Sequence, residues 1–176
     1  MVEFNVAQLL KAVVGDSRLY EIDEEVDSID GTRTMAALTG QVRMTRMPRT
    51  ILVEADLATK VALICSRCLE EIVQPLFIRF VEEYEPSIDV DTGVPVQMGD
   101  GDERFRISEG HILDLAEAVR EYGLLAIPMQ PICRPDCRGL CPECGKNLNA
   151  GDCGCLVGKV DSRLTVLRKL LEEDDD

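Results

Sequence analysis

The chain has 176 residues, of which 45% are hydrophobic, so it can bury one ordinary core and is neither disordered nor fibrous. With no Trp, four Phe and three Tyr, it offers few platforms on which nucleic-acid bases could stack. Its formal net charge of −14 means that much of its surface would repel a polyphosphate.

The composition also bears on the compartment. The segment from Met1 to Asn5 has no basic stretch followed by an apolar one, so it does not resemble a secretory signal. No uninterrupted apolar run reaches the roughly 18 residues that a membrane-spanning helix needs. We therefore expect a cytoplasmic, non-membrane protein, in which reducing conditions favour metal binding by cysteines over disulfides.

The first predicted element is a short helix over residues 6–14, which Asn5 can cap and Gly15 would end. The pattern then changes to strands. Residues 51–63 alternate apolar and charged side chains, which is typical of a strand with one buried face.

A second strand is predicted over residues 72–81, where apolar side chains occupy both even and odd positions, as in a more deeply buried strand. Cys65 and Cys68 then lie at the tip of the hairpin that joins the two strands. Residues 85–103 combine two Pro, three Gly and strong acidity, which predicts a loop.

Two helices are predicted after this loop. Asp114 and Glu117 have the spacing of a capping box at the start of one helix, and Pro128 ends its pattern. Asp161 can cap a last helix. The apolar stripe of that helix consists of Leu164, Leu167, Leu170 and Leu171.

These elements predict an α+β fold: an antiparallel β-sheet or partly open barrel with a few helices and an appended Cys-rich zinc-knuckle module. We expect a β-rich body over residues 1–132, with its main helix near 114–126. The zinc module would cover residues 133–158, and a C-terminal helix and acidic tail residues 159–176.

Eight cysteines supply the thiolates that two tetrahedral metal sites need. The stretch from Cys141 to Gly145 reads Cys-Pro-Glu-Cys-Gly, the form of a zinc knuckle, in which a tight turn points both sulfurs inward. We therefore predict two zinc ions. Their ligands would be Cys65, Cys68, Cys133, Cys137, Cys141, Cys144, Cys153 and Cys155.

The grouping of the ligands follows from their separation along the chain. The last four cysteines are close enough to close a local site, which leaves Cys65 and Cys68 to pair with Cys133 and Cys137. That first site would join remote parts of the chain and contribute folding energy. The alternative grouping combines Cys133, Cys137, Cys141 and Cys144, and separately Cys65, Cys68, Cys153 and Cys155.

The basic residues are concentrated in the cysteine-bearing stretches, and two interpretations are open. They could contact nucleic acid through two groups: Arg33, Arg43, Arg46 and Arg49, and Arg134, Arg138 and Lys146. Alternatively they offset the net charge of −2 of each four-thiolate zinc site, and we favour this interpretation. The residues best placed to do so are Arg67, Arg134, Arg138 and Lys146.

The residues disfavour an enzyme. The single histidine, His111, is expected in a structural setting just before a helix. A zinc ion held by four thiolates has no open position for an activated water. We therefore predict no catalytic residues, no organic cofactor and no small-molecule substrate.

Four motifs of the chain occur together in a known family: Cys65-Ser-Arg-Cys68-Leu69, Glu82-Glu-Tyr84, the helix from Asp114-Leu115 with Glu121, Leu125 and Pro128, and Cys137-Arg-Gly-Leu-Cys-Pro-Glu-Cys-Gly-Lys-Asn-Leu-Asn149. With these motifs the chain resembles the YceD family, whose members are named large ribosomal RNA subunit accumulation proteins. The resemblance runs from about residue 5 to residue 171. Asp161-Ser-Arg163 departs from the family's Asp-Pro-Arg.

The resemblance implies a noncatalytic factor, bacterial or plastid, for accumulation and processing of large-subunit ribosomal RNA and for ribosome biogenesis. Its direct partner would be a large-subunit ribosomal protein, an assembly factor or precursor rRNA. A redox-switched zinc chaperone is the alternative, because Cys-x-Cys and Cys-x-x-Cys on one zinc resemble a thiol sensor.

Overall fold

The computed structural model describes residues 2–90, 92–96 and 105–155. The chain divides into two compact units. One unit, here called the body, comprises residues 1–64 and 71–131, and the other, the Cys-rich unit, comprises residues 65–70 and 132–176. The predicted last helix from Asp161 and the acidic tail lie outside the described residues.

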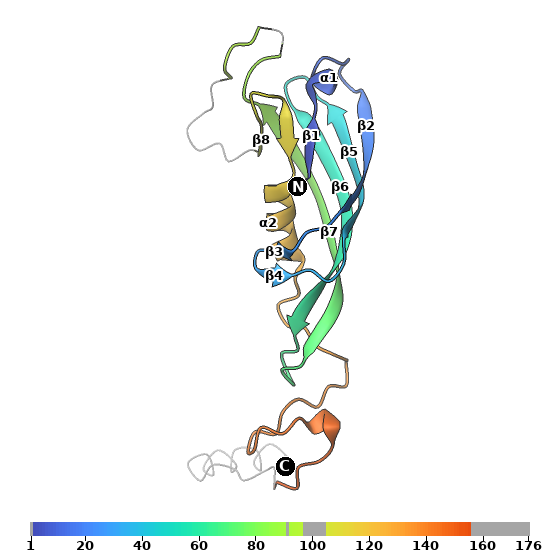
Figure 1. Cartoon of the computed structure of the whole chain (residues 1–176), viewed down its shortest axis with the longest axis vertical. Coiled ribbons are helices and arrows are strands. Elements are labelled where there is room, and N and C mark those ends of the chain that lie inside the picture. Colours follow the sequence, from blue (N-terminus) through green and yellow to red (C-terminus); the bar gives the residue numbers. More distant parts are fainter. Residues whose placement is uncertain (1, 91, 97–104, 156–176) are drawn as a thin grey trace, which may run out of the picture. The chain divides into compact units, whose positions relative to one another are not determined.

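The body is built on a mixed seven-stranded sheet in the order β1-β9-β8-β7-β6-β5-β2, which curls on the side that carries α2 (Figure 1). All neighbouring strands are antiparallel except β7 and β8, so the expected antiparallel sheet or partly open barrel is confirmed in the main and differs at this one parallel pair. The strands are β1 (Glu3–Asn5), β2 (Ser17–Glu24), β5 (Leu38–Arg46), β6 (Ile51–Ile64), β7 (Glu71–Pro86), β8 (Phe105–Ile107) and β9 (Ile112–Asp114). A separate ribbon pairs β3 (Ser28–Ile29) with β4 (Thr32–Arg33).

The longest strands, β6 and β7, form the predicted hairpin. Their register runs from Ile51 opposite Tyr84 to Ile64 opposite Glu71. The hairpin tip, residues 65–70, therefore carries the first cysteine pair, as the sequence pattern predicted. This tip belongs to the Cys-rich unit.

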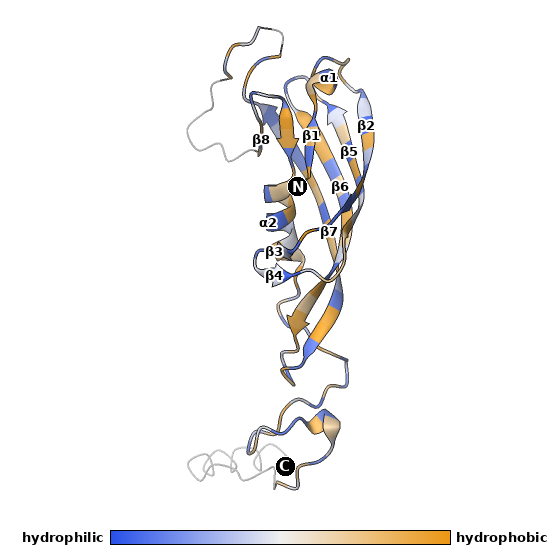
Figure 2. Cartoon of the chain, in the orientation of Figure 1, coloured by the Kyte–Doolittle hydropathy of each residue, from blue (hydrophilic) through white to orange (hydrophobic). Residues whose placement is uncertain are grey.

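The two faces of β7 differ in burial, so the expectation of a more deeply buried strand was wrong for one face. Even-numbered Leu76, Ile78 and Phe80 are at most 5% exposed, whereas odd-numbered Phe77 and Val81 are about 60% exposed. No described element covers this outer face, so apolar character there does not imply burial. Figure 2 shows the apolar residues along β6 and β7 in orange.

The first helix, α1 (Ala7–Leu10), is shorter than the predicted residues 6–14. Asn5 belongs to β1 and Val6 is the N-cap, so the predicted cap was wrong by one residue, although the side-chain oxygen of Asn5 accepts a hydrogen bond from the Ala7 amide. The helix ends early because the Leu10 carbonyl accepts a hydrogen bond from the guanidinium of Arg46.

The second helix, α2 (Ala116–Ala126), packs against β7 and β3. Asp114 belongs to β9, and its carboxylate accepts a hydrogen bond from the Ala116 amide. Gly123 allows the close approach of helix and sheet, because a Cβ there would lie 2.6 Å from Cγ2 of Ile29 and 3.3 Å from Cδ1 of Ile78.

Candidate metal centres

The first candidate centre begins with the turn at the hairpin tip. The Cys65 amide donates to the Glu70 carbonyl (2.9 Å), and the Leu69 amide donates to the Cys65 carbonyl (3.0 Å). To close this turn, Leu69 adopts a φ of 61°, which is rare for a residue with a branched side chain. The turn places the sulfurs of Cys65 and Cys68 on the same side as two later cysteines.

Cys133 and Cys137 complete this first cluster. The Sγ atoms of Cys65 and Cys137 lie 3.9 Å apart, and those of Cys68 and Cys133 lie 3.7 Å apart. All four sulfurs lie within 4.8 Å of one another. Cys65, Cys68 and Cys137 are buried, and Cys133 is half-buried.

The second cluster repeats the geometry of the first turn. The Cys141 amide donates to the Lys146 carbonyl (2.8 Å), and the Gly145 amide donates to the Cys141 carbonyl (2.9 Å). Gly145 has a φ of 70°, so it occupies the position that Leu69 holds in the first turn. The sulfurs of this cluster also lie within 4.8 Å of one another: Cys141, Cys144, Cys153 and Cys155.

The structure thus gathers the cysteines into the two sets of four that the favoured grouping predicted. It does not bring together the sets of the alternative grouping. Four sulfurs around a zinc ion, with Zn–S bonds of about 2.3 Å, lie about 3.8 Å apart in a tetrahedron. The two distances of 3.7 and 3.9 Å in the first cluster fit this arrangement. All eight cysteines are free thiols, so both clusters could hold a metal ion.

Backbone amides favour the thiolate form of one cysteine in each of the two Cys-x-x-Cys turns, here called the first knuckle (residues 65–70) and the second knuckle (residues 141–146). The Cys68 amide, followed by the amides of Arg67 and Cys133, lowers the pKa of Cys65 to about 6. The Cys144 amide, followed by that of Glu143, lowers the pKa of Cys141 to about 7. Each knuckle therefore has one sulfur that is ready to bind a cation near neutral pH.

Other thiols have raised pKa values because they are buried and lie close to sulfurs that would also be charged. Burial, with contacts to Cys137 and Cys68, raises the pKa of Cys133 to about 12. The neighbouring Cys144 and Cys153 raise the pKa of Cys155 to about 12. A bound cation would remove this repulsion, which is the electrostatic pattern of a metal site.

Two asparagines that sequence reasoning left without a role contact the first cluster or the turn that carries it. The Asn149 side-chain amide donates to Sγ of Cys137 (3.3 Å), which lowers the pKa of that thiol. The Asn147 side-chain amide donates to the Glu70 carboxylate (2.8 Å). The signal was present in the sequence, because both residues belong to the Asn-Leu-Asn motif that follows the second knuckle.

Most of the basic residues proposed for charge balance or nucleic-acid contact form hydrogen bonds or ion pairs within the protein. In the Cys-rich unit, Arg138 pairs with Asp152 at 2.6 Å and Arg134 with Asp136 at 3.6 Å. In the body, the guanidinium of Arg46 donates to three backbone carbonyls. Arg33 pairs with Glu71 at 3.0 Å.

His111 lies in neither cluster. It lies directly before β9, and not directly before a helix as expected, and its φ is 60°. Its carbonyl accepts a hydrogen bond from the Val6 amide, which connects this residue to the N-terminal segment.

A mostly β body joined to a unit with two four-cysteine clusters defines a class of β proteins that carry candidate tetrahedral metal sites. The sequence model of a known family, described as "Large ribosomal RNA subunit accumulation protein YceD", matches residues 53–171, more than half of the chain. The chain therefore belongs to the YceD family, as its motifs had indicated.

Individual relatives are distant. The chain is 28% identical over 142 residues to the uncharacterized protein Rv2926c of Mycobacterium tuberculosis, covering 80% of this chain and 65% of the relative. It is 28% identical over 149 residues to a chloroplastic YCED homolog 1 of Zea mays, named a large ribosomal RNA subunit accumulation protein, covering 71% and 50%. The uncharacterized protein YlbN of Bacillus subtilis is 30% identical over 117 residues, covering 64% and 61%.

The chain thus spans less than two thirds of the length of each of these relatives. No solved structure matches the chain. Among the described residues, no helix is both long and apolar enough to span a membrane.

Proposed function

We propose that this protein is a noncatalytic zinc-binding factor that supports accumulation and processing of large-subunit ribosomal RNA during ribosome assembly in the cytoplasm. Family membership supports the link to large-subunit RNA. The observation that carries the zinc assignment is the pair of four-sulfur clusters, each compact enough to surround one ion.

Zinc is the metal that best suits these ligands. Four thiolates favour zinc or an iron–sulfur centre over hard cations such as magnesium and calcium, which bind through oxygen. Two turns of the same geometry, each closed by the same pair of backbone hydrogen bonds, fit a structural zinc site. In such a site the metal contributes directly to the free energy of folding.

A noncatalytic role is consistent with the chemistry of these ligands. Four protein sulfurs fill the coordination sphere of zinc, so no substrate or activated water can bind the ion. The metal then shapes a surface for a partner molecule.

Charge favours a basic protein as the partner over bare RNA. The described part of the Cys-rich unit has four Arg or Lys and four Asp or Glu, and two zinc ions with eight thiolates would bring its net charge to −4. The body is acidic as well, with six acids and no base over residues 21–30. Complementary charge would steer a basic large-subunit protein to this chain and disfavour phosphate.

Depletion in a cell that expresses the chain tests this function. We expect large-subunit RNA to fall relative to small-subunit RNA and its precursors to accumulate, measured by gel analysis of total RNA. Re-expression of the wild-type chain should restore both. Unchanged RNA levels and precursor profiles under several growth conditions would rule the function out.

Copurification at physiological salt then identifies the class of partner. We expect large-subunit proteins to remain bound after treatment with ribonuclease. If only precursor RNA is recovered, and ribonuclease releases every other component, the partner is RNA instead.

A redox-switched chaperone is a second candidate, favoured by the exposure of one cluster. Cys144 is exposed and Cys153 and Cys155 are half-buried, whereas the first cluster is mainly buried. Peroxide could oxidise two thiols to a disulfide, itself being reduced to water, and so release zinc. The test is suppression of aggregation of an unfolded client protein before and after peroxide, and no gain in suppression excludes this candidate.

A further inference from the structure

A short segment connects the two clusters. It belongs to the loop of the second cluster and contacts residues of the first cluster and of its turn. Residues 147–149 lie between Cys144 and Cys153 in the chain. They are anchored within the unit because the Leu148 amide donates to the Gly139 carbonyl (2.9 Å) and Leu140 forms a β-bridge with Asn147.

The side chain of Asn149 has a single orientation that satisfies its neighbours. Its oxygen accepts hydrogen bonds from the Arg138 amide and from the guanidinium of Arg134, both at 2.9 Å. Because both of these groups can only donate, the nitrogen must face the other way, toward Sγ of Cys137 at 3.3 Å. The side-chain amide of Asn149 therefore points toward a sulfur of the first cluster.

Asn147 holds the same segment from its other end. Its side-chain oxygen accepts a hydrogen bond from the backbone amide of Asn149 (2.9 Å), while its side-chain nitrogen donates to the carboxylate of Glu70 (2.8 Å). Glu70 closes the turn that carries Cys65 and Cys68. Through these two asparagines, the loop of the second cluster contacts both halves of the first.

We propose that Asn149, supported by Asn147, is a positioning residue that couples the two metal sites, so that metal in the second cluster strengthens metal binding at the first. The proposal rests on the function proposed above only in requiring that both clusters bind metal. Metal in the second cluster joins Cys141 and Cys144 to Cys153 and Cys155, and so orders the segment between them. The first site then binds metal without the entropic cost of ordering Asn149.

Zinc titration against a competing chelator tests the coupling. The first site is assigned with Cys65→Ser, which should leave about one zinc per chain, and the second with Cys141→Ser, which should do the same. We expect Cys141→Ser to weaken zinc binding at the first site roughly tenfold, within the usual range of coupling between sites. By reciprocity, Cys65→Ser should weaken the second site by the same factor.

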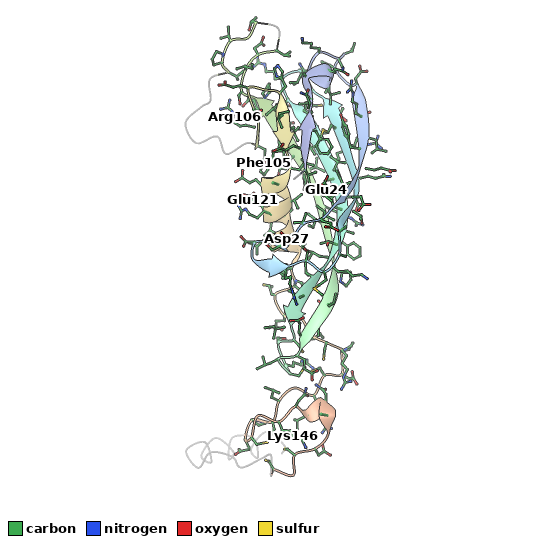
Figure 3. All side chains as sticks on the ribbon, in the orientation of Figure 1. Glu24, Asp27, Phe105, Arg106, Glu121 and Lys146 are labelled. Atoms are coloured by element: carbon green, nitrogen blue, oxygen red, sulfur yellow. The ribbon has the colours of Figure 1, made fainter. Side chains whose placement is uncertain are left out.

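Variants of Asn149 identify the residue that carries the effect. Asn149→Ala should weaken the first site to a similar extent, and adding Cys141→Ser to it should cause little further loss. Asn149→Asp, which keeps the shape but places a charged oxygen near Sγ of Cys137, should weaken it more. The control is Ala150→Ser, at an exposed position next to Asn149 in the loop that also holds Lys146, which is labelled in Figure 3.

Cobalt supplies a readout that a purely structural role would not change. When cobalt fills the first site, loss of the N–H···S hydrogen bond should shift its sulfur-to-metal charge-transfer band in Asn149→Ala and leave it unchanged in Ala150→Ser. Equal first-site affinity in the wild type and Cys141→Ser would overturn the coupling. So would a full effect of Cys141→Ser in the Asn149→Ala background, whereas failure to bind any metal would refute the zinc function itself.

Discussion

Leu69 combines an exposed side chain with a left-handed backbone. It is 63% exposed, and its φ of 61° closes the first knuckle where glycine closes the second. A residue with a Cβ loses about 1–2 kcal/mol in this conformation. The extra freedom of glycine in the unfolded chain offsets only about 0.5–1 kcal/mol of this.

We therefore expect Leu69→Gly to raise the free energy of unfolding of the zinc-loaded protein by about 0.5–1 kcal/mol, measured by denaturant titration. Leu69→Ala is the matched control, because it shortens the side chain but keeps the Cβ. An equal gain in Leu69→Ala would place the effect in the side chain and not in the backbone.

Tyr84 presents the opposite situation, a buried hydroxyl without a partner. The side chain is 1% exposed, and its oxygen has no hydrogen bond within the part of the chain that the structure describes. Removing an unsatisfied buried polar group relieves a cost of about 1–3 kcal/mol. We expect Tyr84→Phe to stabilise the body by about 1 kcal/mol at neutral pH in thermal or denaturant unfolding.

The same residue predicts a pH dependence. Burial, and then the charges of Asp114 and Glu82, raise the pKa of Tyr84 above its usual value of about 10. The folded state therefore disfavours ionisation of the hydroxyl. The free energy of unfolding does not depend on this ionisation below about pH 10, and it falls as pH rises further. Unfolding free energy should fall more steeply above pH 10 in the wild type than in Tyr84→Phe; parallel curves would contradict this.

At the scale of elements, the contact between α2 and the sheet depends on the absence of a side chain. Gly123→Ala would gain up to about 1 kcal/mol from helix propensity. The added Cβ would lie 2.6 Å from Cγ2 of Ile29, a stiff and buried side chain, and overpacking of this kind costs about 1–3 kcal/mol.

Overpacking exceeds the gain in propensity, so we expect Gly123→Ala to lower the stability of the body by about 1 kcal/mol. Amide exchange of α2 should accelerate, which hydrogen-exchange mass spectrometry can measure. Leu125→Ala, at an exposed position of the same helix, removes no buried contact and should leave exchange nearly unchanged.

The elements also indicate where pattern reading works. Alternation correctly predicted the hairpin of β6 and β7, because each strand has one face on the core. It failed for Val73, Phe77 and Val81, since apolar residues on an uncovered face have the same letters as buried ones. The early end of α1 was equally invisible, because it depends on Arg46, which is 36 residues away.

For the candidate site, the short spacing of the last four cysteines predicted the second cluster. The first cluster was then assigned to the four cysteines that remained. The grouping followed from sequence because a Cys-x-x-Cys turn forms locally. Asn149 could not be assigned in the same way, since its contact with Cys137 depends on how the later loop folds over the first cluster's residues.

At the scale of the whole molecule, charge predicts weak contact with bare RNA. The chain has a net charge of −14, and zinc in two four-thiolate sites would make it about −18. We expect binding to large-subunit RNA fragments to be weaker than about 10⁻⁴ M at physiological salt, the weak end of nonspecific binding. Fluorescence anisotropy with labelled RNA measures this, and tight, salt-sensitive binding would instead indicate a basic surface.

The spacing of the cysteines also predicts an order of folding events. Cys65 and Cys137 are 72 residues apart, whereas Cys141 and Cys155 are separated by 14. In an unfolded chain, closing the longer loop costs about 1.4 kcal/mol more, roughly a tenfold lower probability. The second cluster can therefore capture metal on a chain that has not yet folded, while capture at the first waits until β7 and α2 have shortened the path between its ligands. Metal in the first cluster would then mark a chain that has completed its folding.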